Sequence, residues 1–179
     1  MPSVCVFCGS NSGRDERYAA AARQLARTLA ASGLTLVFGG GKIGLMGVIA
    51  DEMLRHSGKV IGVIPQFLYQ REVGHDGVTQ LEIVQSMHER KKRMAELSDA
   101  FIAMPGGWGT LEEIAEILTW KQLGLISQPV GLLNADSFFD PLLAQFQRMM
   151  KDGFLAKDNR DLLIVADEPA VLLGKLGLT

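Results

Sequence analysis

The chain has little cysteine and no excess of positive charge. Its 179 residues include two cysteines, and 18 Lys and Arg stand against 20 Asp and Glu, a formal net charge of -2. Without a positive field there is no general attraction to nucleic acid, so we expect no nucleic-acid partner. No apolar run reaches the ~18 residues of a membrane span, and the start lacks the basic flank and apolar block of a signal peptide. We therefore predict a cytoplasmic protein with no membrane partner.

The two cysteines, Cys5 and Cys8, form a C-x-x-C pattern that elsewhere marks redox pairs and metal sites. Here they lie within Val4–Cys8, an apolar run typical of a buried strand rather than of a helix start. Their odd separation on a strand directs the two thiols to opposite faces of a sheet, so neither a disulfide nor a shared metal fits. We predict core cysteines, and no His, Cys, Asp or Glu spacing indicates a metal site.

The length and composition fit one globular domain over residues 1–179, with 47% apolar and 21% charged residues. Apolar runs typical of strands occur at Val4–Cys8, Leu34–Phe38, Val60–Ile64, Ala100–Met104, Val130–Leu133 and Leu162–Val165. Helical patterns lie between most of them, among them Glu16–Ala31 before Gly33 and a second that ends at His56 before Gly58. This order predicts a doubly wound α/β protein with a parallel sheet covered by helices on both faces. Only Gln66–Gln85 is irregular, and we interpret it as a working loop.

Three predicted strand-to-helix turns are rich in glycine and small polar residues: Gly9–Gly13, Gly39–Gly44 and Pro105–Thr110. In a doubly wound sheet such turns meet at the carboxyl edge, where ligands bind. Glycine lets backbone N–H groups approach an anion, and the helix that follows adds unpaired donors and a partial positive charge. The turns therefore predict a phosphate-bearing ligand, with Ser10, Gly40 and Gly41 among its contacts.

The second turn, with Gly39, Gly41 and Gly44, also satisfies the G-x-G-x-x-G pattern of dinucleotide-binding proteins. That fingerprint expects an acidic residue about 20 positions later to hold a ribose, and none follows in the next strand. A triphosphate-binding loop does not fit either, because no Gly-Lys-Ser/Thr closes the run. The alternative is a tight turn that packs its helix closely on the sheet, and the pattern alone leaves both interpretations open.

The third turn continues into Thr110 and Glu113, ahead of a predicted helix over Leu111–Leu123. The hydroxyl of Thr110 can bind a phosphate oxygen, but Thr110 and Glu113 also have the spacing of a helix capping box. Against a purely capping role, Glu113 falls on a helix face near the sheet edge, where an unused carboxylate would be costly. The two interpretations stay open on this pattern.

A dense basic run lies between Met87 and Met94 and is typical of a solvated helix face. Arg90, however, comes three residues after Met87 and four before Met94, so it falls on the apolar stripe, with Lys91 beside it. An inward guanidinium requires a partner, and a phosphate or carboxylate is the natural one. By contrast, Tyr69, His75 and His88 stand alone and are interpreted as surface or packing residues.

The combination of Met87-His88-x-Arg90-Lys91 with Pro105-Gly106-Gly107-x-Gly109-Thr110-x-x-Glu113 resembles the Lonely Guy (LOG) family of cytokinin riboside 5'-monophosphate phosphoribohydrolases. The similarity extends from Phe7-Cys8-Gly9-Ser10 through the second glycine turn to Pro129–Asn134. Members are often labelled possible lysine decarboxylases, but nothing in this sequence indicates a pyridoxal-phosphate lysine pocket.

The resemblance implies a Rossmann-like homodimer without cofactor or metal that hydrolyses a nucleoside 5'-monophosphate to free base and ribose 5-phosphate. Arg90 and Glu113 match the catalytic pair of the family. Its nucleotide contacts match Glu72, Lys91, Gly107, Trp108, Gly109, Thr110, Leu111, Glu112 and Thr119. Trp108 replaces the more usual Tyr and keeps an aromatic wall.

This chemistry agrees with the residues themselves. Breaking a ribosyl C–N bond develops positive charge on the sugar, which a preorganised carboxylate such as Glu113 stabilises while it steers the attacking water. Arg90 has two open roles, holding the phosphate or keeping Glu113 ionised. A different class of function, a non-catalytic module that senses a mononucleotide, uses the same glycine turns and is the alternative. The preferred base, plain or modified adenine, stays open.

Overall fold

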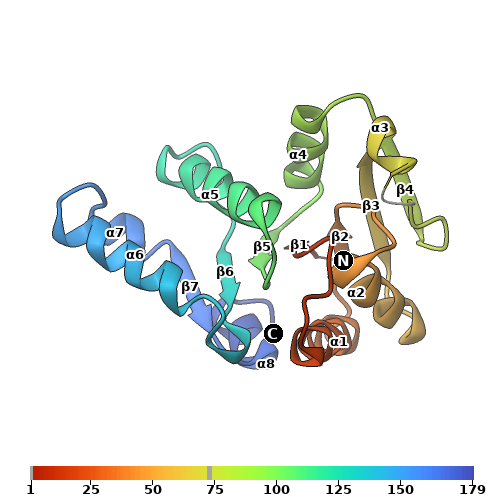
Figure 1. The fold of residues 1–179 in the computed structure, drawn as a ribbon, viewed down its shortest axis with the longest axis horizontal. Helices are drawn as coiled ribbons and strands as arrows, with labels where there is room; N and C mark the ends of the chain where they lie inside the picture. The colour runs from red at the N-terminus through yellow and green to blue at the C-terminus, as the bar shows by residue number, and fades with distance from the viewer. Residues whose placement is uncertain (1, 72–73) are drawn as a thin grey trace.

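The fold is built around one parallel sheet, as the computed structural model, which describes residues 2–71 and 74–179, makes clear (Figure 1). Within those residues the sheet has 7 strands in the order β4-β3-β2-β1-β5-β6-β7. The strands are β1 (Ser3–Phe7), β2 (Thr35–Phe38), β3 (Val60–Pro65), β4 (Gln80–Val84), β5 (Ala100–Ala103), β6 (Val130–Leu133) and β7 (Leu163–Ala166). Val4 of β1 pairs with Leu36 of β2 on one side and with Ala100 of β5 on the other. The predicted doubly wound α/β class is confirmed.

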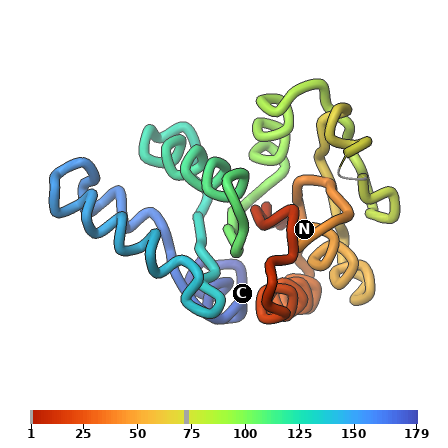
Figure 2. The backbone as a smooth tube through the Cα atoms, in the orientation of Figure 1, coloured from red at the N-terminus to blue at the C-terminus, as the bar shows by residue number. Residues whose placement is uncertain are grey.

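Helices cover both faces of the sheet (Figures 1 and 2). They are α1 (Glu16–Ala31), α2 (Gly44–Arg55), α3 (Gln66–Tyr69), α4 (Met87–Glu96), α5 (Trp108–Gln122), α6 (Asp140–Lys151), α7 (Lys157–Arg160) and α8 (Pro169–Lys175), with a 3₁₀ turn, η1, over Ala135–Ser137. Helices α1, α2 and α8 pack on one face in a core that contains Leu25, Met53 and Leu172. Helices α4, α5 and α6 cover the other face around Met94 and Ile114. Each face therefore has its own apolar core.

The strands predicted from apolar runs agree with the structure to within one residue at each end, and Glu16–Ala31 is confirmed as α1. Two predictions are wrong. The segment predicted to be irregular contains α3 and the edge strand β4, because a strand with one open edge carries polar residues and lacks a continuous apolar run. The helix expected from Leu111 begins at Trp108, so Gly109, the last glycine of the third turn, already belongs to it.

Chain order in the sheet reverses at β1, which lies between β2 and β5. In doubly wound sheets the connections leave to opposite faces at this point and open a crevice at the carboxyl ends of the strands. The three glycine turns follow β1, β2 and β5, so the topology places all of them at the crevice. Within the described part of the chain, every helix is too short or too polar to span a membrane.

Candidate functional site

A cleft of about 540 Å³ opens at this reversal point. Its lining comes from β1 and the turn after it, from Gly39, from α4 and from Pro105–Thr110, and includes both Arg90 and Glu113. The volume is within the range of roughly 300–1,000 Å³ usual for small-molecule sites. The motifs that are far apart in the sequence therefore share one cavity.

The glycine turns approach one another so closely that side chains would not fit between them. A Cβ atom at Gly44 would lie 2.2 Å from the carbonyl carbon of Ser10, and one at Gly106 would lie 2.8 Å from the backbone nitrogen of Gly9. Backbone hydrogen bonds join the same segments: Gly9 donates to the carbonyl of Pro105 at 3.1 Å, and Leu45 donates to that of Gly9 at 3.0 Å. The floor of the cleft is thus a rigid arrangement of backbone.

The N-terminus of α5 provides an uncompensated set of donors at this floor. Its N-cap is Gly107, which has no side chain to bind the first N–H groups, so of the two interpretations left open for Thr110 and Glu113 the capping box does not hold. Thr110 is the third residue of the helix and is 2% exposed, and within the described residues its Oγ1 has no hydrogen-bond partner. A buried hydroxyl without a partner costs free energy unless a ligand uses it. This hydroxyl lines the cleft together with the glycines around it.

Arg90 is buried, as its place on the apolar stripe predicted, with 6% of the residue exposed. Its Nε donates to the carbonyl of Val63 at 3.1 Å and its Nη2 to the carbonyl of Gly39 at 2.6 Å. A side chain at position 39 would displace the guanidinium, because a Cβ there would lie 2.1 Å from Nη2. Carbonyl dipoles at the ends of β2 and β3 therefore orient the guanidinium, and part of its donor capacity remains for a ligand.

Glu113 lines the same cleft, one helical turn after Thr110. Burial raises the pKa of the Cys5 thiol, and the charge of Glu113 raises it further, while that of Arg90 lowers it. Burial followed by the charge of Glu113 also raises the pKa of Cys8. Both cysteines are free and buried, in the cores of opposite sheet faces, as predicted. Arg90 and Glu113 therefore bring opposite charges to the lining of one cleft, and both charges affect the pKa of nearby Cys5.

Other predicted contacts are distributed in two ways. Ser10, Gly107, Trp108 and Gly109 line the cleft, and the side chain of Trp108 stands at its rim, 88% exposed. Among the described residues the lining does not include Gly40, Gly41, Lys91, Leu111, Glu112 or Thr119. Glu72 lies outside the described residues.

Lys91 instead joins the two helices beside the cleft. Its ammonium group bonds to Glu112 and, at 3.1 Å, to Glu116, both on α5. These hydrogen bonds to carboxylates raise the pKa of Lys91 against the effect of its partial burial, which lowers it. The hydroxyl of Thr119 donates a hydrogen bond to the carbonyl of Ala115, one turn earlier in α5. In this structure Lys91 therefore ties α4 to α5.

One end of the cleft is aromatic, which the motifs did not indicate. Tyr18 and Phe138 line it and pack edge to face with ring centroids 5.5 Å apart. Phe138 follows Asp136 and Ser137, two residues with positive φ of 54° and 58°. The signal in the sequence is the strand-to-helix turn after Val130–Leu133, which has no glycine motif but ends at the same sheet edge as the other turns.

A pyridoxal-phosphate site requires a lysine for its Schiff base. No lysine is among the cleft-lining residues that the structure describes. The residues that are present do not fit that group. Across residues 2–71 and 74–179 there is also no cluster of three or more His, Cys, Asp and Glu suited to a metal ion.

Comparison with known proteins points to one family. Residues 46–176 match the family model described as "Possible lysine decarboxylase". Rice (Oryza sativa subsp. japonica) has a probable cytokinin riboside 5'-monophosphate phosphoribohydrolase, LOGL1, that is 48% identical over 97% of this chain and 78% of its own length. The rice phosphoribohydrolase LOG is 47% identical over 97% of this chain and 72% of its own length. The phosphoribohydrolase LOG5 of Arabidopsis thaliana is 44% identical over 97% of this chain and 76% of its own length.

Among solved structures, the molybdenum cofactor carrier protein of Chlamydomonas reinhardtii superposes with a TM-score of 0.74 at 23% identity, covering 99% of this chain and 98% of that one. A molybdenum cofactor binding protein from Rippkaea orientalis superposes with a TM-score of 0.73 at 24% identity, covering 100% of this chain and 98% of that one. At these identities the likeness establishes the fold alone.

Proposed function

The chain belongs to the family described as possible lysine decarboxylases, which includes the LOG phosphoribohydrolases, and from this premise we propose that it is a nucleoside 5'-monophosphate phosphoribohydrolase. It hydrolyses the N-glycosidic bond of AMP or of cytokinin riboside 5'-monophosphates, giving the free base and ribose 5-phosphate. The observation that carries this proposal is that buried Arg90 and partly buried Glu113 line the same cleft as the N-terminus of α5.

The phosphate end of the substrate fits the start of α5. Three features favour an anion there: the Oγ1 of Thr110 and the N–H groups after Gly107, for which the described part of the chain provides no side-chain partner, and the dipole of a 15-residue helix. Glycine turns on both sides allow the phosphate oxygens to approach the backbone. Binding the phosphate holds the sugar in place and so orients C1' for the reaction.

The reaction adds water across the C1'–N bond. The electron pair of that bond leaves with the base, the hydroxyl of the water joins C1', and its proton ends on the base. Positive charge develops on the ribose before the new bond is complete, and the Glu113 carboxylate stabilises it and orients the water. Arg90, whose charge is held at the cleft floor by two carbonyls, either binds the phosphate or keeps Glu113 ionised.

A direct assay tests this activity. The protein is incubated with AMP and with isopentenyladenosine 5'-monophosphate, and ribose 5-phosphate is measured. Glu113→Gln keeps the shape of the side chain and removes its charge, so we expect turnover to fall by about 10³-fold with nucleotide binding retained. Failure of the wild type to release product from any nucleoside monophosphate would remove the proposal. If AMP raised the Tm of such a protein, the mononucleotide sensor would take its place.

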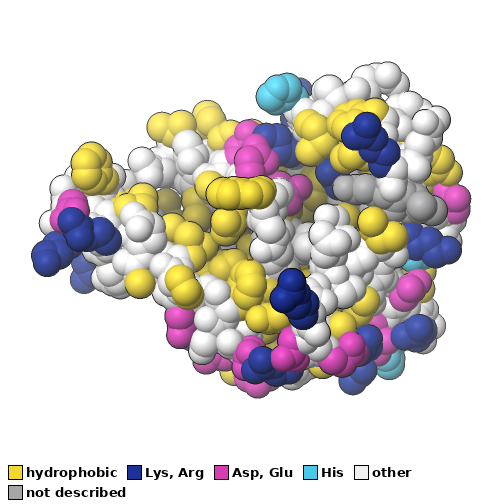
Figure 3. All heavy atoms as spheres, viewed as in Figure 1, with side chains coloured by type: hydrophobic (Ala, Val, Ile, Leu, Met, Phe, Trp, Pro, Cys, Tyr) yellow, Lys and Arg dark blue, Asp and Glu magenta, His cyan; other side chains and the backbone are white. Residues whose placement is uncertain are grey.

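We also propose that the protein is a homodimer that pairs through α5 and α6. No residue of α6 is buried, and Leu123, Leu125 and Phe154 near these helices are 65%, 68% and 85% exposed. Figure 3 shows hydrophobic side chains gathered in the hollow between the two helices. Exposed apolar surface of this kind favours association. Light scattering should give twice the 19.4 kDa chain mass, and a monomeric mass for Leu125→Glu; a monomeric wild type would contradict this.

We further propose a cytoplasmic location, which the free thiols of Cys5 and Cys8 favour because a reducing compartment keeps cysteines unpaired. Cell fractionation with an antibody to the protein checks it, and recovery outside the cytoplasm would contradict it.

A further inference from the structure

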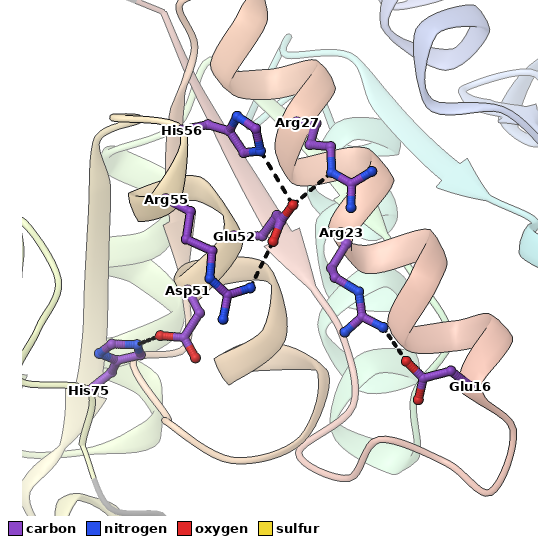
Figure 4. A network of polar contacts seen from close by, with 8 residues as sticks. All are labelled: Glu16, Arg23, Arg27, Asp51, Glu52, Arg55, His56 and His75. Carbon is purple, nitrogen blue, oxygen red and sulfur yellow. Dashed lines mark hydrogen bonds and ion pairs between the residues drawn. The ribbon is translucent and has the colours of Figure 1, made fainter.

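His75 is a buried polar residue that the proposed reaction does not use. It lies between α3 and β4 and is 4% exposed. Its Nε2 is 3.0 Å from Oδ1 of Asp51 on α2 (Figure 4), whereas within the described residues its Nδ1 is buried with no hydrogen-bond partner. Burying an imidazole with one nitrogen unpaired costs free energy. A residue that only filled space here would be apolar, so the bond to Asp51 requires an explanation.

The backbone around His75 is attached to the second glycine turn. The N–H of His75 donates to the carbonyl of Gly40 at 2.9 Å, and Gly74 forms an antiparallel bridge with Gly41. Helix α2, which carries Asp51, begins at Gly44 directly after the same turn. The turn is therefore held from one side by the backbone of residues 74–75 and fixed to α2 through the side chain of His75.

The same glycine turn sets the position of Arg90. Gly39 accepts from Nη2 of Arg90 at 2.6 Å, and Gly40, the next residue, has a φ of +77° with little room for movement. A Cβ at Gly40 would lie 3.0 Å from Ile64, which shows how closely the turn packs on β3. A continuous series of contacts thus leads from Asp51 through His75 and the turn to the guanidinium.

We propose that His75 is a positioning residue for this site. Its bond to Asp51 fixes the Gly39–Gly41 turn, and the carbonyl of Gly39 then holds the Arg90 guanidinium in the orientation that the reaction uses. His75 itself does not touch the substrate. The kinetic consequence rests on the proposed phosphoribohydrolase function, whereas the structural coupling between His75 and Arg90 is independent of it.

Two amide substitutions test the coupling, because each reproduces one ring nitrogen. In His75→Gln the amide nitrogen lies near the place of Nε2 and can still bond Asp51, whereas in His75→Asn it lies near that of Nδ1, which has no partner here. The readout is the ¹⁵N–¹H resonance of Arg90 Nη2, the atom that donates to the carbonyl of Gly39, assigned by its loss in Arg90→Lys. We expect His75→Gln to keep the resonance and His75→Asn to speed its hydrogen exchange by about tenfold, since a weakened hydrogen bond opens more often.

Kinetics give the second readout. His75→Asn should lower kcat/KM for AMP by about tenfold and His75→Gln by less than about threefold, because small displacements of a reacting group are costly. Introduced into Arg90→Lys, His75→Asn should have little further effect, since the two residues act through one contact. Asp51→Ala, at a side chain that is 49% exposed, should reproduce His75→Asn without disturbing the core. Asp76→Ala, next to His75 in the sequence, is the control, because its carboxylate accepts from Tyr69 and contacts neither Asp51 nor Gly40. We expect it to leave kcat/KM unchanged.

Three results would overturn the proposal: an unchanged Arg90 resonance in both His75→Asn and Asp51→Ala, equal losses in the Gln and Asn variants, or a His75→Asn loss that persists in full beside Arg90→Lys. If the wild type hydrolysed no nucleotide, the proposed function would fail, while the resonance of Arg90 would still test the coupling.

Discussion

Glu52 and Arg90 are two buried charged residues that the fold stabilises in opposite ways. They are 5% and 6% exposed. The carboxylate of Glu52 lies 2.7 Å from Nε of Arg27, 3.0 Å from Nη1 of Arg55 and 3.4 Å from Nε2 of His56 (Figure 4). The guanidinium of Arg90 instead donates to two backbone carbonyls at the ends of strands.

The difference separates a structural charge from a functional one. Glu52 joins α1 to α2 with its charge shared among several cations, and the hydrogen bond from Arg27, with those from Arg55 and His56, lowers its pKa to about 2 despite burial. Carbonyl dipoles orient Arg90 without cancelling its full charge, so it can still act on an anion. Removing Glu52 should therefore affect folding, and removing Arg90 should affect the reaction.

The largest expected effect comes from Arg90→Met. Turnover of AMP should fall by about 10³-fold, because a positioned charge in a desolvated site contributes strongly to the rate. The Tm should fall by only a few degrees, because the apolar side chain still fills the space while the carbonyls of Gly39 and Val63 lose this donor. Steady-state kinetics measure the turnover and calorimetry measures the Tm on the same preparation. A strongly destabilised protein with normal turnover would show that Arg90 is the structural charge.

Gly39→Ala tests how Arg90 is oriented. The new Cβ would lie 2.1 Å from Nη2 and would displace the guanidinium without changing its charge. We expect turnover to fall by about 10²-fold, the effect of moving a reacting group by about 1 Å. Gly174→Ala is the control, because this residue of α8 is not among the cleft-lining residues and its Cβ would meet no atom closer than 3.9 Å. Equal activity in Gly39→Ala and the wild type would show that the carbonyl contact does not orient the arginine.

Thr110→Val addresses the anion end of the cleft. It removes a buried hydroxyl that lacks a partner within the described residues, so the Tm should stay equal or rise. Nucleotide binding should weaken by about tenfold, the loss of about one hydrogen bond to a charged group. Titration calorimetry with AMP measures the affinity, and unchanged affinity would place the phosphate elsewhere.

Glu52→Gln should have the smallest effect and none on turnover. At neutral pH we expect the Tm to fall by about 2–4 °C, the shift that about 1 kcal/mol produces in a chain of this size. The pKa of Glu52 is lowered from 4.5 to about 2, so its contribution is complete above about pH 4.5 and lost as the pH falls toward 2. The Tm difference between variant and wild type should shrink over that window. A difference independent of pH would contradict the ionic explanation.

The sequence predicted best where one signal dominates. Continuous apolar runs located the buried strands, and the 3.6-residue period placed Arg90 on the inner side of α4, because burial on a regular element leaves a direct pattern. The edge strand Gln80–Val84 was missed, since its exposed positions break the run. The start of α5 was misjudged because Gly107 and Gly109 suggest a loop, although glycine at and after the N-cap lets a ligand approach the helix end.

The parts of the site that sequence reasoning missed depend on contacts between distant segments. His75 was interpreted as a surface or packing residue, yet it bonds Asp51 on α2 and holds Gly40, 35 positions earlier in the chain by their residue numbers. Tyr18 and Phe138 meet because the start of α1 and the end of η1 lie at the same sheet edge. No periodicity in one segment reports a partner in another, so these assignments require coordinates.

A Cβ at position 39 would lie 2.1 Å from Nη2 of Arg90, and this proximity also has an evolutionary consequence. While arginine occupies position 90, we expect a side chain at position 39 to impair the proposed reaction, because it would displace the guanidinium. Loss of the arginine releases that constraint. Descendants that have abandoned this chemistry should therefore be recognisable by paired drift at two sites 51 positions apart, before the rest of the fold has diverged.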